Sequence, residues 1–311
     1  MFSREVTEHG YVTYPRRFEG YKWYNPIITA IVFGIFFSIF MGISLIIAII
    51  LVGDYKIIVE MSRGGYDSFN TYTAAGIFST LVPLAVAIPA LMLTAVLRKD
   101  RPFSSYSSSR GGWNWKIFLK MMIPSLILFG IPNFIFSYEK GANVVQFTVI
   151  GFILATIFGP LQCVAEEYMF RSLIMQTVGS WFRIPILAII IQVIIFASLH
   201  PYNIVGVAAV AVCGLGMGLA TYLTKGLEAS SASHIVNNMV GFYMVGFGIG
   251  KLQKEVAVRD LVIDIVAFVI YIGFIIFVDK KYHWFDEVKK DDVAIFNEKK
   301  QQKVANKAKA E

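Results

Sequence analysis

Long apolar stretches separated by short polar segments dominate the pattern of positions along this chain. Several windows of about 18 or more residues carry few or no charges, which is typical of helices that cross a membrane. About eight spans are predicted, at residues 27–52, 74–97, 117–137, 145–182, 184–200, 203–224, 228–249 and 261–279. The pattern therefore predicts an all-α polytopic membrane protein.

Two of these stretches need a separate interpretation because of their length. The stretch 145–182 is too long for one crossing, and a kink is expected at Gly159 and Pro160, because proline lacks a backbone donor. It is predicted to be either a broken helix or a helix that extends beyond the bilayer. The stretch 27–52 is too long for the apolar core of a signal peptide, so a retained first span is expected.

Composition and charge agree with a membrane protein and predict its orientation. Hydrophobic residues make up 56% of the chain and charged residues only 16%, against about 25% charged residues in soluble domains. With the N-terminus inside, 21 lysines and arginines fall on the cytoplasmic side and 6 on the outer side. This asymmetry predicts that both termini are cytoplasmic and that the number of crossings is even. The basic residues lie in loops and the tail, so the lipid bilayer is an expected partner and nucleic acid is not.

The same pattern divides the chain into five segments. They are a cytoplasmic N-terminal segment (1–26), N-terminal transmembrane helices (27–144), a core with membrane-embedded polar residues (145–250), a last loop and helix (251–279), and a lysine-rich cytoplasmic tail (280–311). The tail is expected to fix the topology, with contact to anionic lipid headgroups as the alternative.

Few ionisable or strongly polar side chains fall at membrane depth, and such residues indicate function by default because burying them is costly. They are Glu166, Glu167, Arg171, His200, His234 and Asn238. Glu167 and Arg171 are four residues apart on a helix and predict an ion pair. Glu166 points about 100° away and lacks this partner. Chemistry is therefore predicted for Glu166 and a structural role for the other two, with a helix-packing ion cluster as the alternative.

Helix lengths predict whether these residues can meet. Glu166 precedes the turn after the fourth stretch by 17 residues and His200 follows it by 17, so both lie roughly 25 Å from that turn. His234 follows the next turn by only 9 residues, with Asn238 one helical turn deeper on the same face. Asn237 could substitute for either. The four residues converge only if the helices before and after the first turn protrude or tilt.

A carboxylate, two imidazoles and a carboxamide can hydrolyse an amide bond. Glu166 would activate water with help from His200, while His234 and Asn238 would donate to the oxyanion. Alternatively, Glu166, His200 and His234 could bind Zn²⁺ with one position open for water. The chain has no G-x-S-x-G or H-E-x-x-H pattern, and its two cysteines are expected to be packing residues, so nucleophilic catalysis by serine or cysteine is not expected.

Three short motifs carry a resemblance to a known family. EEYMFR (166–171) fits EExxxR, FASLH (196–200) fits FxxxH, and HIVNN (234–238) fits HxxxN. In this order on apolar helices, they resemble the CAAX protease and bacteriocin-processing (Abi) family of intramembrane endopeptidases, which includes the prenyl-protein CAAX endopeptidase. The resemblance covers about residues 145–250, and Ser172 stands where a glycine often follows the motif arginine.

The resemblance implies about eight helices around an intramembrane cavity that opens toward the cytoplasm and the membrane. It implies a peptidase of a bacterial plasma membrane that cuts a membrane-embedded or lipidated peptide or protein. The implied roles are catalytic for Glu166, His200, His234 and Asn238, and supporting for Glu167, Arg171 and Phe196. The family has been described both as zinc metalloproteases and as metal-free, glutamate-dependent peptidases, and the metal-free form is favoured here.

Two other interpretations of the same residues stay open. A non-catalytic membrane scaffold or bacteriocin self-immunity protein would keep the motifs for packing. A proton-coupled transporter could use the glutamate and histidines as a proton relay. No internal repeat in the sequence supports a transporter.

Overall fold

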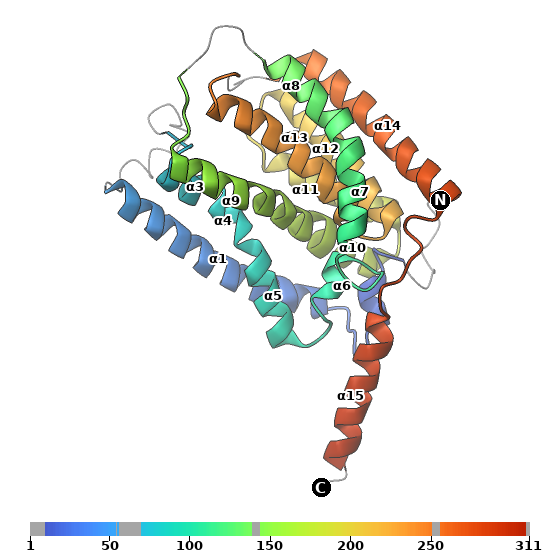
Figure 1. Cartoon of the computed structure of the whole chain (residues 1–311). Coiled ribbons are helices and arrows are strands. Elements are labelled where there is room, and N and C mark those ends of the chain that lie inside the picture. Colours follow the sequence, from blue (N-terminus) through green and yellow to red (C-terminus); the bar gives the residue numbers. More distant parts are fainter. Residues whose placement is uncertain (1–9, 54, 56–69, 139–143, 251–255, 309–311) are drawn as a thin grey trace.

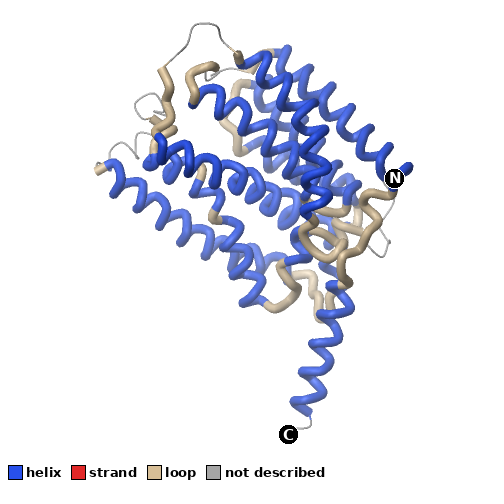
Figure 2. The backbone as a smooth tube through the Cα atoms, viewed as in Figure 1, coloured by secondary structure: helices blue, strands red, loops and turns tan. Residues whose placement is uncertain are grey.

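The computed structural model describes residues 10–53, 55, 70–138, 144–250 and 256–308, which form helices and loops (Figure 2). The prediction of an all-α membrane protein is confirmed. The helices are η1 (Tyr14–Arg17), α1 (Asn25–Val52), α3 (Ala74–Thr80), α4 (Val82–Ala85), α5 (Ala87–Arg98), α6 (Ser104–Ser107), α7 (Trp115–Ser125), η3 (Leu126–Gly130), α8 (Ile131–Ser137), α9 (Val149–Glu167), η4 (Tyr168–Ile174), α10 (Met175–Phe182), α11 (Pro185–Ser198), α12 (Ile204–Thr224), α13 (Glu228–Gly246), α14 (Val258–Tyr282) and α15 (Asp292–Ala308).

All eight predicted stretches are helical, but fewer are apolar and long enough to cross a membrane alone. Within the described ranges, α1, the continuous run α7–α8, the run α9–α10, α12 and α14 meet that condition. Helix α3 and the run α4–α5 form a sixth span if their 45° bend lies within one crossing. Helix α11 has only 14 residues, and α13 carries several serine and asparagine side chains. The predicted number of about eight crossings stays a prediction.

The helices run back and forth between two ends of the bundle (Figure 1). The end from which α15 projects is called the tail end, and it holds the first residues of α1, α7 and α13. The opposite end is called the far end, and it holds the connections around residues 70–73, 144–148, 199–203 and 247–250.

All five tryptophans lie at the tail end. Trp181 at the end of α10 donates from Nε1 to the carbonyl of Trp23 before α1, at 2.8 Å. Trp113 and Trp115 flank the start of α7, and Trp284 follows α14 under the Lys120 ammonium. Tryptophan gathers where a membrane meets water. The tail end is therefore one membrane–water boundary of the bundle.

The two terminal segments meet at the tail end. Tyr14 and Phe18 pack with Phe296 of α15. The Glu19 amide donates to Asn297 Oδ1 at 2.8 Å. Segments that lie on the same side of a membrane require an even number of crossings between them, as the charge pattern predicts.

Four helices that arrive at the tail end stop at a basic residue with left-handed backbone geometry. These residues are Lys99, Arg183, Lys225 and His283, with φ between 51° and 58°. Glycine usually occupies positions with this backbone conformation, because a Cβ makes the conformation unfavourable by about 1–2 kcal/mol. A cation here offsets part of that cost, because it neutralises the negative end of the helix dipole.

Small residues on α12 let its neighbours approach closely. A Cβ on Gly218 would lie 2.7 Å from Gln192 Nε2 of α11, and one on Gly214 would lie 3.2 Å from the Phe196 ring. Gln192 uses this closeness to donate to the Gly214 carbonyl at 2.9 Å. On the opposite face, Gly216 makes room for Phe268 of α14. Close helix approach through small residues is the usual way of packing in membranes, and here it fixes Phe196.

The fourth predicted stretch is helical across Gly159 and Pro160, so no break occurs there, and the kink expected at these residues stays a prediction. Helix α9 continues through Pro160, and the departure from α geometry comes later, in the π-helical segment η4. Gly159 serves close packing, because a Cβ there would meet the Met239 side chain of α13. The run α9–α10 has 34 residues and is therefore about 50 Å long, well beyond the roughly 30 Å of a hydrocarbon core. This length agrees with the predicted alternative of a helix that extends past the bilayer.

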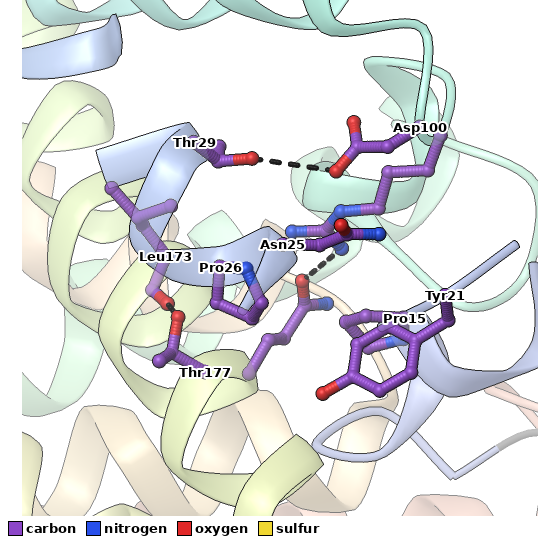
Figure 3. A pocket seen from close by; sticks show the side chains of 10 residues that line it. Pro15, Tyr21, Asn25, Pro26, Thr29, Asp100, Leu173 and Thr177 are labelled. Carbon is purple, nitrogen blue, oxygen red and sulfur yellow. Dashed lines mark hydrogen bonds between the residues drawn. The ribbon is translucent and has the colours of Figure 1, made fainter. Parts of the chain in front are cut away.

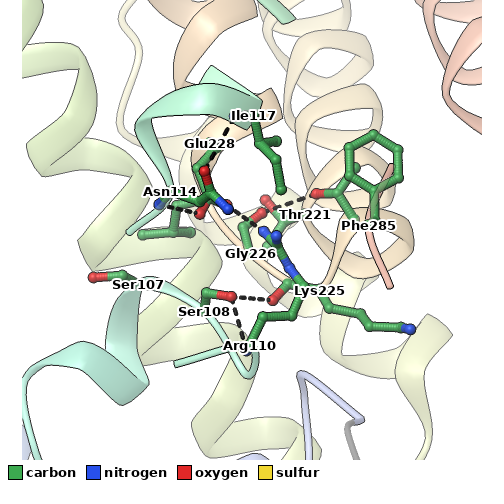
Figure 4. A network of polar contacts seen from close by, with 12 residues as sticks. Ser107, Ser108, Arg110, Asn114, Ile117, Thr221, Lys225, Gly226, Glu228 and Phe285 are labelled. Atoms are coloured by element: carbon green, nitrogen blue, oxygen red, sulfur yellow. Dashed lines mark hydrogen bonds and ion pairs between the residues drawn. The ribbon is translucent and has the colours of Figure 1, made fainter. Parts of the chain in front are cut away.

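The serine-rich connection before α7 is buried, although its composition is typical of a surface loop. Arg110 Nη2 pairs with Glu228 Oε2 at 2.8 Å, and both side chains are almost fully buried (Figure 4). Glu228 also accepts from the Asn114 amide at 2.8 Å. Ser108 donates to the Lys225 carbonyl at 3.0 Å. This network holds the connection against the start of α13.

A second polar contact ties α1 and the end of α5 to α10. Arg101 donates to Gln176 Oε1 at 2.5 Å, and Thr29 of α1 donates to Asp100 at 3.3 Å (Figure 3). These groups surround a cavity of about 20 Å³, which is room for about one water.

The Arg110–Glu228 pair gives the first testable prediction. Arg110→Ala leaves the Glu228 carboxylate buried without a counter-charge, so we expect a loss of about 3–5 kcal/mol in the free energy of unfolding. Denaturant titration of the detergent-solubilised protein measures it. Asp286→Ala is the control, because it removes only exposed pairs, with Lys225 at 3.6 Å and with His283 at 2.9 Å, and should cost less than about 1 kcal/mol. Equal losses for both variants would contradict the assignment.

Candidate active site

The end of α9 and the segment η4 bring a fully buried ion pair into the bundle. Arg171 Nη1 lies 3.1 Å from Glu167 Oε1, and neither side chain is exposed, which confirms the predicted pair. The Arg171 guanidinium also lies over the Phe196 ring, 4.3 Å from its centre. Its Nη2 contacts the Met217 sulfur at 3.4 Å. Arg171 therefore connects η4 with α11 and α12.

His234 of α13 lies between the two adjacent glutamates. Its Nδ1 is 2.7 Å from Glu167 Oε1, and its Nε2 is 3.6 Å from Glu166 Oε2. A carboxylate can only accept, so His234 Nδ1 carries a proton toward Glu167 and the Nε2 atom faces Glu166. Glu167 thus orients His234 in addition to neutralising Arg171, which adds a specific contact to the mainly structural, supporting role predicted for it.

Only one oxygen of Glu166 has a hydrogen-bond partner, because Oε2, the oxygen that faces His234, accepts no hydrogen bond. The partner is Gln162, one turn earlier on α9, which donates from Nε2 to Glu166 Oε1. Glu166 is buried, with 7% of its surface exposed. Sequence reasoning missed Gln162, although an amide four residues before Glu166 in an apolar helix was the available signal.

A cavity of about 450 Å³ adjoins this group. Its walls come from α8, α9, α13, the residues around α3 and the connection between α11 and α12. The polar residues that line it are Tyr72, Asn133, Ser137, Gln162, Tyr202 and Asn238. Because Gln162 both lines the cavity and bonds Glu166, it connects the cavity with the buried carboxylate.

The two neighbouring asparagines of α13 have different surroundings. Asn238 lines the large cavity. Asn237 accepts from Asn133 Nδ2 of α8 at 3.2 Å and donates to Asn238 Oδ1 at 3.4 Å. Asn237 is thus engaged in a helix contact, and Asn238 is the asparagine available to a molecule in the cavity.

His200 does not contact Glu166 among the described contacts, contrary to the predicted partnership. It lies just beyond the last residue of α11, and its Nδ1 donates to the Phe196 carbonyl at 2.8 Å. The ring centres of His200 and Phe196 are 4.7 Å apart, and those of Phe196 and His234 are 6.3 Å apart. The Phe196 ring therefore neighbours both histidines and Arg171. His234 takes the place beside Glu166 that the sequence assigned to His200.

The proposed zinc ligands do not form a metal site. Within the described ranges, no group of three or more histidine, cysteine, aspartate or glutamate side chains could hold a metal ion. Both ring nitrogens of His234 already face carboxylates. The metalloprotease alternative is therefore not supported, and no chemical step is assigned to a metal.

Two cysteines and one aspartate are further residues of the membrane region. Both cysteines, Cys163 and Cys213, are free and buried, which agrees with a packing role. Asp264 of α14 lies beside Cys213, and its described interactions do not include Glu166 or Glu167. It falls inside the predicted span 261–279 and was missed, although a lone carboxylate in an apolar stretch was a clear signal.

Comparison with known proteins supports the resemblance carried by the motifs. Residues 146–240 match the family model described as type II CAAX prenyl endopeptidase Rce1-like, so this part of the chain is similar to Rce1-like endopeptidases. The match includes all seven residues predicted for the site and about a third of the chain. No curated protein and no solved structure matches the chain.

The buried ion pair predicts the effect of one substitution on stability. Arg171→Ala leaves Glu167 in the interior without its cation, so the free energy of unfolding should fall by about 3–5 kcal/mol. Unfolding in detergent, followed by tryptophan fluorescence, measures the loss. Glu166→Gln keeps the size of the side chain and removes no ion pair with arginine or lysine, so it should cost much less. A stable Arg171→Ala protein would contradict this account of the pair.

Proposed function

We propose that this chain is an intramembrane peptidase in which Glu166 and His234 activate water for hydrolysis of a peptide bond. The similarity to Rce1-like endopeptidases supports a CAAX-protease-like activity at the level of the family. The observation that carries the proposal is the placement of the His234 ring between Glu167 at 2.7 Å and Glu166 at 3.6 Å, beside a cavity of about 450 Å³.

In the proposed reaction, Glu166 is the general base. It takes a proton from a water molecule whose oxygen then attacks the carbonyl carbon of the substrate. His234 Nε2 lies 3.6 Å from Glu166 Oε2, and a closer approach in the substrate complex would let it receive this proton and deliver it to the leaving nitrogen when the C–N bond breaks. Glu167 supports this cycle because a carboxylate on Nδ1 stabilises the imidazolium form.

Asn238 and His200 take the remaining roles. The carboxamide of Asn238 faces the cavity and would donate to the oxyanion of the tetrahedral intermediate. His200 has Nδ1 bonded to Phe196, so its Nε2 is the atom that would meet substrate or water near the cavity rim. Arg171 and Phe196 act through the residues that they hold in place.

The substrate in this proposal is a membrane-embedded or lipidated peptide or protein. The integral, multi-pass nature of the chain supports a substrate that is itself membrane-associated. A plasma membrane of bacterial type is the proposed location.

Glu166→Gln tests the central role. The amide cannot accept the proton of the attacking water, so kcat for a membrane-anchored peptide should fall by about 10²–10⁴-fold while the protein still folds. Asp264→Asn is the matched control, because it also neutralises a carboxylate in a transmembrane helix but leaves the glutamates untouched. If the Glu166 variant keeps full activity, the proposal is wrong and a scaffold that keeps the motif for packing becomes the better account.

Asn238→Ala tests the oxyanion role. Removing one donor to the oxyanion should lower kcat by about 10²–10³-fold with a smaller change in KM, because the bond is made mainly in the transition state. Asn237→Ala is the neighbouring control, and it should have a smaller effect on kcat because Asn237 acts only through Asn133 and Asn238. Equal losses in the two variants would remove Asn238 from this role.

A further inference from the structure

We infer that the substrate enters the cavity from the exported face of the membrane, and that the enclosed part of the substrate is an uncharged peptide segment. This inference rests on the proposed function, because it names the side and the chemistry of the molecule that the same cavity accepts.

The cavity opens at the far end of the bundle. Tyr72 lies just before α3, Ser137 is the last residue of α8, Tyr202 lies in the connection between α11 and α12, and Val245 is near the end of α13. All four line the cavity and all four lie at far-end connections. Gln162 lies at the deep end of the cavity, next to Glu166. A peptide therefore reaches Glu166 from the side opposite to α15.

The two ends differ sharply in basic residues. Among the described residues, Arg259 is the one lysine or arginine at the far end, and it pairs with Asp260 at 2.9 Å. The other cations predicted for that side, Lys56, Arg63, Lys140, Lys251 and Lys254, lie outside the described residues. The charge pattern of the sequence assigns 21 of the 28 lysines and arginines to the side of the termini, and two of them, Arg4 and Lys309, lie outside the described residues. By the positive-inside rule, the tail end is cytoplasmic and the far end is exported.

Two expectations from the sequence are thereby incompatible. The charge pattern predicts cytoplasmic termini, and the resemblance implies a cavity that opens toward the cytoplasm. The terminal segments and the cavity rim lie at opposite ends of the bundle, so only one of these expectations can hold. A cytoplasmic cavity would place the 21 basic residues and the lysine-rich α15 on the exported side. The charge asymmetry therefore favours a cavity that opens on the exported face of the membrane.

The lining indicates what the cavity accepts. Its polar side chains are carboxamides and hydroxyls, and no charged side chain lines it within the described residues. The carboxamides of Asn133, Gln162 and Asn238 can each donate to and accept from a peptide backbone. Apolar neighbours such as Leu81 and Phe242 can contact uncharged side chains. No charged side chain among the described lining residues could pair with a charged residue of the peptide, and an ion pair with Glu166 would occupy the base. The fitting substrate is therefore a membrane-attached peptide that is uncharged around the cleaved bond.

Cysteine accessibility in intact cells tests the side of entry. The native thiols are removed with Cys163→Ala and Cys213→Ala, and single cysteines are placed by Tyr202→Cys at the cavity rim or Val304→Cys on α15. A membrane-impermeant maleimide should label the Tyr202→Cys protein in intact cells. It should label the Val304→Cys protein only after permeabilisation. Ser137→Cys is a second rim variant in case Tyr202→Cys does not fold.

The reverse pattern would overturn the inference, and so would rim cysteines that are labelled only after permeabilisation. Labelling needs no peptidase activity, and the pattern should be the same when Glu166→Gln is added. If the labelling is as expected but Glu166→Gln does not reduce cleavage, the proposed function is refuted. The inferred side of entry is then still supported by the labelling.

Sealed membrane vesicles test the chemistry of the substrate. A lipid-anchored peptide that is uncharged around its cleaved bond is added outside right-side-out or inside-out vesicles. Cleavage should be at least about tenfold faster in the right-side-out vesicles, and a lysine or aspartate beside the cleaved bond should slow it by about tenfold or more. Equal cleavage of the charged and uncharged peptides would overturn the assignment of an uncharged segment.

Discussion

The buried charge of Glu167 is the constraint on which the arrangement of the site depends. A carboxylate at this depth must be neutralised, and Arg171 does so from the next helical turn. The same oxygen also meets His234 of α13, and the same guanidinium lies on Phe196 of α11. One neutralised charge thus fixes three helices relative to each other, and with them the distance between His234 and Glu166.

Helix α13 is held by two such buried groups along its first two turns. Glu228, its first residue, pairs with Arg110, and His234 meets the two glutamates of α9. Both contacts reach across long sequence separations, so the start of α13 can neither slide nor rotate without exposing a lone charge to an apolar interior. A geometry suited to proton transfer needs this kind of support, because a loss of alignment of about 1 Å is enough to impair catalysis.

The sequence predicted what depends on local spacing. The apolar stretches, the Glu167–Arg171 pair and the residues that gather near one depth follow from helical periodicity and from the costs of burying charge. The partner of Glu166 could not be predicted, because the register between helices depends on where α11 ends, on the length of α9–α10 and on the π-helical turn at η4. The buried position of the 102–112 connection depends on Arg110 finding Glu228 more than a hundred residues later. The end at which the cavity opens depends on the same long-range packing.

The basic residues that terminate helices at the tail end have a mechanical consequence. Lys99, Arg183, Lys225 and His283 each mark the point where a helix stops and where it meets the polar boundary. Moving such a helix inward by even one residue would undo its terminal geometry and draw the basic group into hydrocarbon. The position of these helices along the membrane normal is thus fixed at the tail end. Any splaying of the helices to admit a peptide must then pivot on this end, so that the opposite rim widens while the depth of the glutamates in the membrane stays the same.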